Sequence, residues 1–204
     1  MPDFFNEDMA KRYDERNSKL AAISDNLHFL IRLVLADLPS RARILCVGDP
    51  SREMLEMCRA RLAQEGVGER CELIHGYVQD TPEAPAFDAV LSVLVAHFIA
   101  RAERRAFYAN VFQRLKPEGC FVSAEISTDF SAPEFPAMLK NWEQIQALMG
   151  APPESLRNLD DTLRNALSVL SPSETVVLWR ESGFSMPVQF FQSFMIHGWY
   201  ARKP

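Results

Sequence analysis

The sequence lacks a glycine-rich loop, although it contains the kind of strand and helix between which such a loop commonly stands. Glycine accounts for 8 of 204 residues, and no cluster of glycines follows any predicted strand. A dinucleotide-binding fingerprint needs several glycines at one strand-to-helix turn, so this absence argues against a dehydrogenase-type nucleotide site.

Long apolar runs and an excess of positive charge are also missing. The longest apolar stretch, around residues 89–100, is interrupted by Ser92 and His97 and is too short to span a bilayer. The net charge of −5 argues against a nucleic-acid partner, which attracts basic surfaces. Residues 1–8 are acidic and have no apolar core, so we expect no secretory signal, no membrane partner and a cytoplasmic protein.

The sequence has four cysteines, and their spacing matches no metal-binding pattern. All of them fall in predicted helices or strands. We therefore expect reduced, buried thiols and no metal site; the residues are Cys46, Cys58, Cys71 and Cys120.

The chain is organised around one strand and the helix that follows it. Residues 44–47 form an apolar run that predicts a buried strand, and Gly48 allows the backbone to turn sharply after it. Residues 49–51, Asp-Pro-Ser, then open a helix with an apolar stripe. A strand, a tight turn that carries an acid and a helix are typical of the start of a nucleotide-binding α/β unit.

Hydrophobic periodicity predicts an alternation of strands and helices over much of the chain. The predicted helices cover about 6–16, 19–38, 50–65, 101–115, 133–149, 153–169 and 171–183. The predicted strands cover about 43–48, 71–75, 87–94, 120–126, 187–193 and 194–201, with a turn at 116–119 and the last two strands paired as an antiparallel hairpin. This order favours a three-layer α/β sandwich around a mostly parallel sheet.

We expect one domain over residues 1–204, made of three parts. An N-terminal helical cap covers 1–40, the sheet core comprises 41–130 and 171–204, and a helical insertion covers 131–170. A chain of this length can bury a substantial core without a second domain.

Four stretches, in a fixed order from about Asp8 to Lys203, carry a family resemblance. They are 49–55 (DPSREML), 86–92 (AFDAVLS), 115–125 (LKPEGCFVSAE) and the closing strand pair after 182–184 (SGF). In this order and spacing they resemble the class I S-adenosylmethionine-dependent methyltransferases, in the branch that acts on small molecules.

The resemblance implies a Rossmann-like methyltransferase fold that has been shortened by one β-α unit. In the family, a glycine-rich loop, a helix and a second strand separate the first strand from the aspartate, whereas here Gly48 runs directly into Asp49. We expect a sheet that lacks the second strand, in the order 71–75, 43–48, 87–94, 120–126, 194–201, 187–193. Either the helix at 50–65 moves over to cover the face that the missing helix leaves, or apolar surface stays exposed. Exposed apolar surface predicts a homodimer that can exchange elements between its subunits.

The resemblance also implies S-adenosyl-L-methionine as cofactor, with six candidate contacts at Tyr13, Gly48, Asp49, Tyr77, Val78 and Ser92. Asp49 matches the acid that accepts hydrogen bonds from the ribose hydroxyls, with capping of the next helix as the alternative. Tyr77 stands where many members carry an aspartate, and its ring could stack on adenine. Gly48 is alternatively a turn residue, and Tyr13, matched to a tyrosine that closes over the cofactor, is alternatively a packing residue.

His97 and Glu125 are the candidate catalytic residues, because both lie at the carboxyl ends of predicted strands, where doubly wound sheets bind ligands. His97 could act as a base for a substrate hydroxyl or amine, or pack beside Phe98. Glu125 could hold a substrate or a proton, or be a solvated acid. Asp88, near the start of a strand, is expected to anchor backbone amides.

Two functions remain open at this point. The first is a methyltransferase that acts on a small-molecule acceptor bound under the helical insertion. The second is a catalytically impaired protein of the same fold, which has lost the cofactor loop and acts as an oligomeric binding or structural module.

Overall fold

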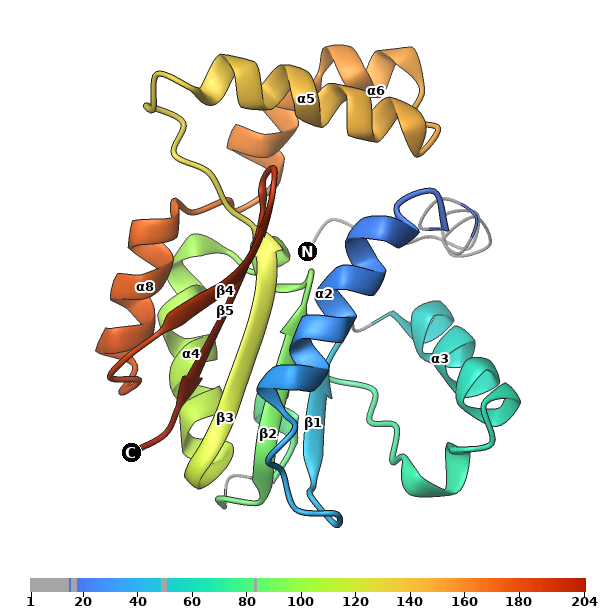
Figure 1. The fold of residues 1–204 in the computed structure, drawn as a ribbon, viewed down its shortest axis with the longest axis vertical. Helices are drawn as coiled ribbons and strands as arrows, with labels where there is room; N and C mark the ends of the chain where they lie inside the picture. Colours follow the sequence, from blue (N-terminus) through green and yellow to red (C-terminus); the bar gives the residue numbers. More distant parts are fainter. Residues whose placement is uncertain (1–14, 16–17, 49–50, 83) are drawn as a thin grey trace.

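A five-stranded sheet forms the centre of the computed structural model, which describes residues 15, 18–48, 51–82 and 84–204 (Figure 1). The strands are β1 (Ile44–Val47), β2 (Phe87–Val93), β3 (Leu115–Ile126), β4 (Val188–Ser193) and β5 (Ile196–Arg202). Their order across the sheet is β1-β2-β3-β5-β4. The first three run parallel, and β5 is antiparallel to both β3 and β4. The predicted fold class is confirmed, including the antiparallel C-terminal pair.

Helices cover both faces of the sheet. Helix α2 (Ala21–Val34) lies across one face, and α4 (Arg101–Arg114) and α8 (Pro172–Glu181) lie on the other, while α3 (Arg52–Gln64) stands beyond the β1 edge (Figure 1). Short 3-10 turns are η1 (Gly68–Arg70), η2 (Val78–Asp80) and η3 (Ala96–Phe98).

A group of helices stands over the carboxyl ends of β1, β2 and β3 (Figure 1). It comprises α5 (Phe135–Leu148), α6 (Pro153–Arg157), α7 (Leu159–Asp161) and the π-helical turn η4 (Thr162–Ala166). We call residues 135–166 the helical unit. The helix predicted over 153–169 is therefore divided into three short pieces.

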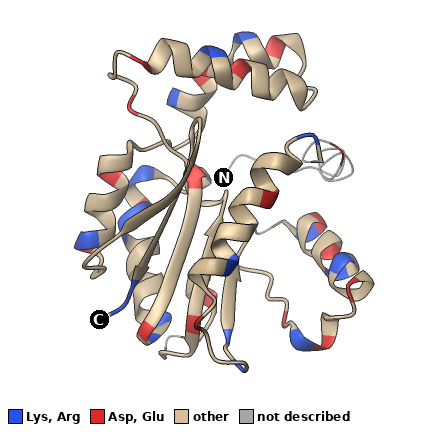
Figure 2. Cartoon of the chain, viewed as in Figure 1, with Lys and Arg blue, Asp and Glu red and all other residues tan. Residues whose placement is uncertain are grey.

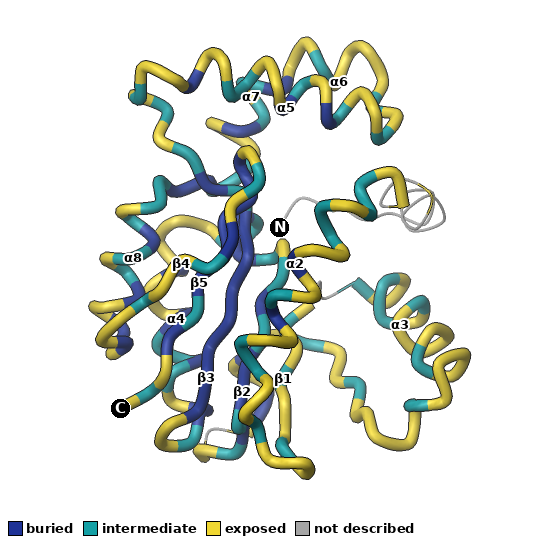
Figure 3. Tube along the Cα trace, in the orientation of Figure 1, coloured by how far each residue is buried: buried dark blue, intermediate teal, exposed yellow. Residues whose placement is uncertain are grey.

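The core consists of two apolar clusters, one on each face of the sheet. On the α2 face, Leu27 and Ile31 join the sheet and the helical unit in one cluster, as the predicted stripe of the 19–38 helix requires. On the other face the cluster is aromatic, and the Phe121 and Trp179 rings stack with their centroids 4.4 Å apart. Figure 3 shows β3 buried along most of its length, as expected for the central strand.

The start of α8 agrees with its sequence signals. Ser171 and Glu174 form the predicted capping box, and Pro172 stands in the first turn. Beyond the helix, Gly183 has a φ of +109° and the Phe112 ring lies 2.8 Å from where a Cβ would be. Only glycine fits this turn, which directs the chain into β4.

The strand predicted over 71–75 is wrong. These residues form no strand in the structure, and β1 stands at the edge of the sheet in the part of the chain that is described. The rest of the predicted strand order is confirmed. A strand at 71–75 would need the missing second strand or a direct pairing with β1, and β1 offers only four residues, Ile44 to Val47.

Two smaller predictions also need correction. The turn predicted at 116–119 lies inside β3, where the pairing with β2 shifts register and Glu118 adopts a φ of +63°. Of the four cysteines, only Cys120 is buried, because β1 and α3 lie at the uncovered side of the sheet; Cys46, Cys58 and Cys71 are exposed.

Charged residues of both signs are interspersed over the outer helices, and the strands carry few of them (Figure 2). No helix in the described ranges is both long and apolar enough to cross a membrane. The helix predicted over 6–16 falls mostly outside the described residues.

Candidate active site

The parallel strands end beneath the helical unit (Figure 1). Four of the predicted site residues lie at or near these strand ends in the sequence. Gly48 follows β1, Ser92 and His97 lie at and beyond the end of β2, and Glu125 lies at the end of β3. The loop that contains Tyr77 and Val78 leads into β2. Tyr13 and Asp49 lie outside the described residues.

The backbone at Gly48 is open. A Cβ built there would meet no atom within 4 Å in the part of the chain that is described. The next helix, α3, has Ser51 as its N-cap, because the Met54 N–H donates to Ser51 Oγ at 3.1 Å. The capping role considered for Asp49 is thus filled by Ser51.

The loop before β2 presents Tyr77 to solvent and buries Val78. The Tyr77 side chain is 51% exposed, so its ring has a free face. Asp80 is engaged locally, since its Oδ2 accepts from the Tyr77 N–H at 2.7 Å. This arrangement leaves the Tyr77 ring, rather than Asp80, available for a ligand.

Arg114 of α4 holds this loop in place. Its guanidinium is buried and donates to Gln79 O and Thr81 O, both at 2.9 Å, and to Thr81 Oγ1 at 2.8 Å. It also donates to Asn110 in its own helix, so all five of its N–H groups have acceptors.

Ser92 is fully buried in β2, in register with Ser123 of β3. Neither hydroxyl has a hydrogen-bond partner among the residues that the structure describes. A contact between Ser92 and a cofactor stays a prediction.

His97 is buried in η3 and is held at both its ring and its backbone. The Ile126 N–H donates to His97 Nδ1 at 3.3 Å, and the Ser168 N–H donates to the His97 carbonyl at 2.8 Å. Burial, together with the nearby Arg104 charge, lowers the pKa of His97 to about 3. The imidazole is therefore neutral at pH 7, with its hydrogen on Nε2, and the base role of His97 stays a prediction.

Glu125 is fully buried and already has partners. Its Oε2 accepts from Arg104 Nη1 at 2.6 Å, and its Oε1 accepts from the Tyr108 hydroxyl at 3.1 Å. Burial, and then the Glu125 charge, raise the pKa of Tyr108. The alternative of a solvated acid is wrong for Glu125, and its catalytic role stays a prediction.

Sequence reasoning missed Arg104 and Arg114, the two buried cations of α4. A signal for them was present, because 104 and 114 lie on the same helical face as Phe107, Tyr108 and Val111. Asp88 was assigned correctly, since its Oδ2 accepts from the Arg43 N–H at 2.8 Å. Lys116 also pairs with its carboxylate at 2.9 Å.

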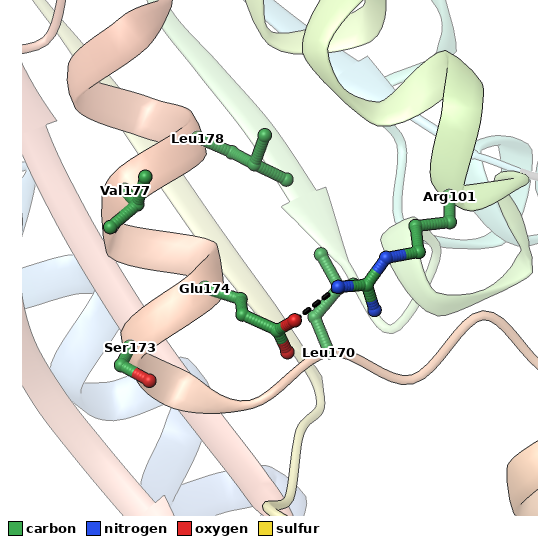
Figure 4. Close-up of a pocket in the computed structure, with 6 residues that line it drawn as sticks. All are labelled: Arg101, Leu170, Ser173, Glu174, Val177 and Leu178. Atoms are coloured by element: carbon green, nitrogen blue, oxygen red, sulfur yellow. Dashed lines mark hydrogen bonds and ion pairs between the residues drawn. The ribbon is translucent and has the colours of Figure 1, made fainter.

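A hollow of about 360 Å³ lies between the start of α4 and α8, beside the Arg101–Glu174 ion pair (Figure 4). A second hollow of similar volume lies beside α3. Neither is lined by a predicted site residue. No group of three or more His, Cys, Asp or Glu side chains able to hold a metal occurs within the described ranges.

A comparison with known protein families shows to which family the chain belongs. Residues 7–119, more than half of the chain, match the family described as a methyltransferase domain. The chain belongs to the methyltransferase domain family. The match covers β1, β2, α4 and the loop before β2, and so includes all the cofactor residues predicted above.

Individual proteins resemble this methyltransferase domain at low sequence identity. A carboxy-S-adenosyl-L-methionine synthase of Trichodesmium erythraeum (strain IMS101) is 26% identical over 139 residues, which is 67% of this chain and 54% of that protein. The chain thus spans about half the length of this curated relative.

Two solved structures share the fold of the methyltransferase domain. A possible exported protein from Bordetella parapertussis has a TM-score of 0.64 at 16% identity, covering 91% of this chain and 69% of that one. The PH0226 protein from Pyrococcus horikoshii OT3 has a TM-score of 0.62 at 12% identity, covering 89% of this chain and 91% of that one.

Proposed function

We propose that this methyltransferase domain transfers a methyl group from S-adenosyl-L-methionine to a small-molecule acceptor. The observation that carries the proposal is the family match over residues 7–119. The parallel strands β1, β2 and β3 of this sheet end beneath the helical unit. The name of the Trichodesmium relative supports the choice of cofactor. The expectations of a cytoplasmic location and of a single domain over 1–204 belong to the same proposal.

The chain's own residues suit the adenosine end of this cofactor. The exposed Tyr77 ring can stack on adenine above the buried Val78, and the bare backbone at Gly48 admits close approach of a ligand. Asp49, outside the described residues, is proposed to accept from the ribose hydroxyls. Bound S-adenosyl-L-methionine supplies an electrophilic methyl group on a sulfonium.

The acceptor is proposed to bind between the helical unit and the carboxyl ends of the strands. Methyl transfer from a sulfonium depends mainly on alignment of the two reactants, so positioning is the main contribution of the protein. His97 and Glu125 fit such a role, because both are buried and held by hydrogen bonds. His97 can donate from Nε2, whereas its Nδ1 is occupied by Ile126.

Calorimetric titration with S-adenosylmethionine and S-adenosylhomocysteine tests this function. We expect micromolar binding that is weakened by roughly one to two orders of magnitude in Asp49→Ala, because charge-assisted hydrogen bonds to the ribose contribute about 1.5–3 kcal/mol. Asp37→Ala is the matched control, since Asp37 is an exposed acid near the end of α2. The absence of heat and of a thermal shift at millimolar ligand would overturn the proposal.

The second candidate function is a module that has lost catalysis. It is favoured by the β1 side of the sheet, where none of residues 52–64 is buried and Ile44 is 43% exposed. In the described part of the chain, no glycine-rich wall faces the place where the methionine end of the cofactor would lie. The calorimetric result decides between the two functions.

We also propose that the chain forms a homodimer through this β1 side, in which the two copies can exchange elements. An unpaired edge strand and a helix without buried residues are surfaces that a second copy can cover. Light scattering at micromolar concentration should give twice the chain mass of 23.2 kDa. Ile44→Lys should shift the mass to that of one chain, and Met186→Lys, at a 76% exposed site far from β1 in the sequence, should not. A monodisperse wild-type monomer would contradict the dimer.

A further inference from the structure

Arg104 joins four segments at one buried point. Its side chain is fully buried on the inward face of α4. Its Nε donates to the Ile99 carbonyl at 3.2 Å, and its Nη1 donates to Tyr108 at 2.8 Å and to Glu125 at 2.6 Å. Its Nη2 donates to the Ser168 carbonyl at 2.9 Å. A single guanidinium thus connects the residue that follows η3, helix α4, the end of β3 and the segment after the helical unit.

The contact with Ser168 is significant because the chain leaves the helical unit there. Leu170, two residues later, forms a parallel bridge with Ser127, and its carbonyl accepts from Ser127 Oγ at 2.7 Å and from the Thr128 N–H at 3.1 Å. Thr128 lies on the connection that leads from the end of β3 into the helical unit. Both connections of the unit therefore lie side by side at the end of β3, and Arg104 holds the outgoing one.

The orientation of the helical unit relative to the sheet must come from these hydrogen bonds. The helical unit also touches the sheet through apolar side chains such as Trp142 and Leu163, but apolar contacts impose little orientation. The guanidinium is planar and donates along fixed directions, so its acceptors can satisfy it in only one arrangement. An apolar pair of similar volume would avoid the desolvation of two charges, so this buried ion pair is suited to specifying geometry rather than adding stability.

We propose that Arg104 is a positioning residue that fixes the orientation of the helical unit over the carboxyl end of the sheet. Glu125 holds the guanidinium in place, and the guanidinium in turn fixes the Ile99 and Ser168 carbonyls, to which it donates. A further consequence, that the acceptor binds tightly only when the helical unit is correctly placed, rests on the proposed function. The orientation itself does not.

The test compares Arg104→Met with the double variant Arg104→Met/Glu125→Met. The single variant leaves a buried carboxylate without its cation and is expected to lower the urea midpoint strongly. The double variant removes both charges at similar volume, so its urea midpoint should lie clearly above that of Arg104→Met. It should stay below that of the wild type, because the Ile99 and Ser168 carbonyls and the Tyr108 hydroxyl lose their partners. Arg105→Met is the matched control, because Arg105 is the next residue of α4 and is 68% exposed.

The measured quantity is the mobility of the helical unit in the double variant. We expect hydrogen exchange at Ser168 and tryptic cleavage within the unit to be at least tenfold faster than in the wild type and in Arg105→Met. Exchange across α8 and β5 should stay unchanged. The exposed tryptic sites are Lys140, Arg157 and Arg164.

A double variant with wild-type exchange and cleavage would overturn the positioning role and leave Arg104 a structural cation. The affinity for S-adenosylmethionine should stay within twofold of the wild-type value in the double variant. If the wild type binds no S-adenosylmethionine, the proposed function fails, and exchange and cleavage still decide the role of Arg104.

Discussion

Replacing Arg114 by Met is expected to lower the free energy of unfolding by about 3 kcal/mol, because it leaves buried oxygens without donors. The side chain is 1% exposed and supplies hydrogen bonds to Gln79 and Thr81 of the loop before β2. Thr81 is itself buried, so water cannot fully replace these bonds. Urea unfolding monitored by tryptophan fluorescence measures the change.

Replacing Arg114 by Met should also weaken the candidate cofactor site. The loop held by Arg114 carries Tyr77 and Val78, so affinity for S-adenosylmethionine should fall in the variant even under conditions where it is folded. Arg101→Met in the same helix is the control. Arg101 is 64% exposed and its ion pair with Glu174 lies on the surface, so it should change stability by less than about 1 kcal/mol. Equal effects of the two substitutions would show that Arg114 does not hold the loop.

Asn in place of His97 should remove a large part of the protein's sensitivity to acid. Burial, with Arg104 nearby, lowers the pKa of His97 to about 3, whereas an unfolded histidine titrates near its ordinary value of about 6.5. Between these values the unfolded chain binds the extra proton, so folding stability is lost as pH falls from about 6.5 towards 3. At pH 4 this difference amounts to roughly 3 kcal/mol.

The measurement is urea unfolding at pH 7 and pH 4. The loss of stability between the two should be roughly 3 kcal/mol smaller in His97→Asn than in the wild type. Asn offers an oxygen that can accept from the Ile126 N–H, so the variant should fold at pH 7. His75→Asn is the control at an exposed site. His197, whose pKa burial lowers to about 4, titrates in all of these proteins and cancels in the comparison. An identical acid profile for His97→Asn would exclude a buried, neutral His97.

The sequence allowed the fold to be predicted wherever local pattern and packing agree. The inward stripe of α2, the capping box of α8 and the continuous apolar run of β2 each specify one element, and all three are present. The segment 71–75 has the composition of a strand, but the edge strand β1 offers only four residues for pairing, and strand formation depends on pairing as much as on composition. The burial of Cys46 and Cys58 was mispredicted for the same reason, because the layer that would cover them is missing.

The site was less predictable than the fold. Positions near the strand ends could be identified because topology places them, as for His97 and Glu125. Their environments could not, since the burial of Glu125 depends on a cation 21 positions away in the sequence and on Tyr108 between them. Charged residues on an inward helical stripe, such as Arg104 and Arg114, are the pattern that would have predicted these environments.

The uneven sheet has a consequence for how the molecule opens. β3 is buried between two partners over much of its twelve residues, whereas β1 has four residues and one neighbour in the described chain. Local opening therefore begins at β1 and α3, well before the cooperative loss of the central strands. Destabilising substitutions in β3 should therefore lower the free energy of global unfolding, whereas those in α3 should mainly promote local opening.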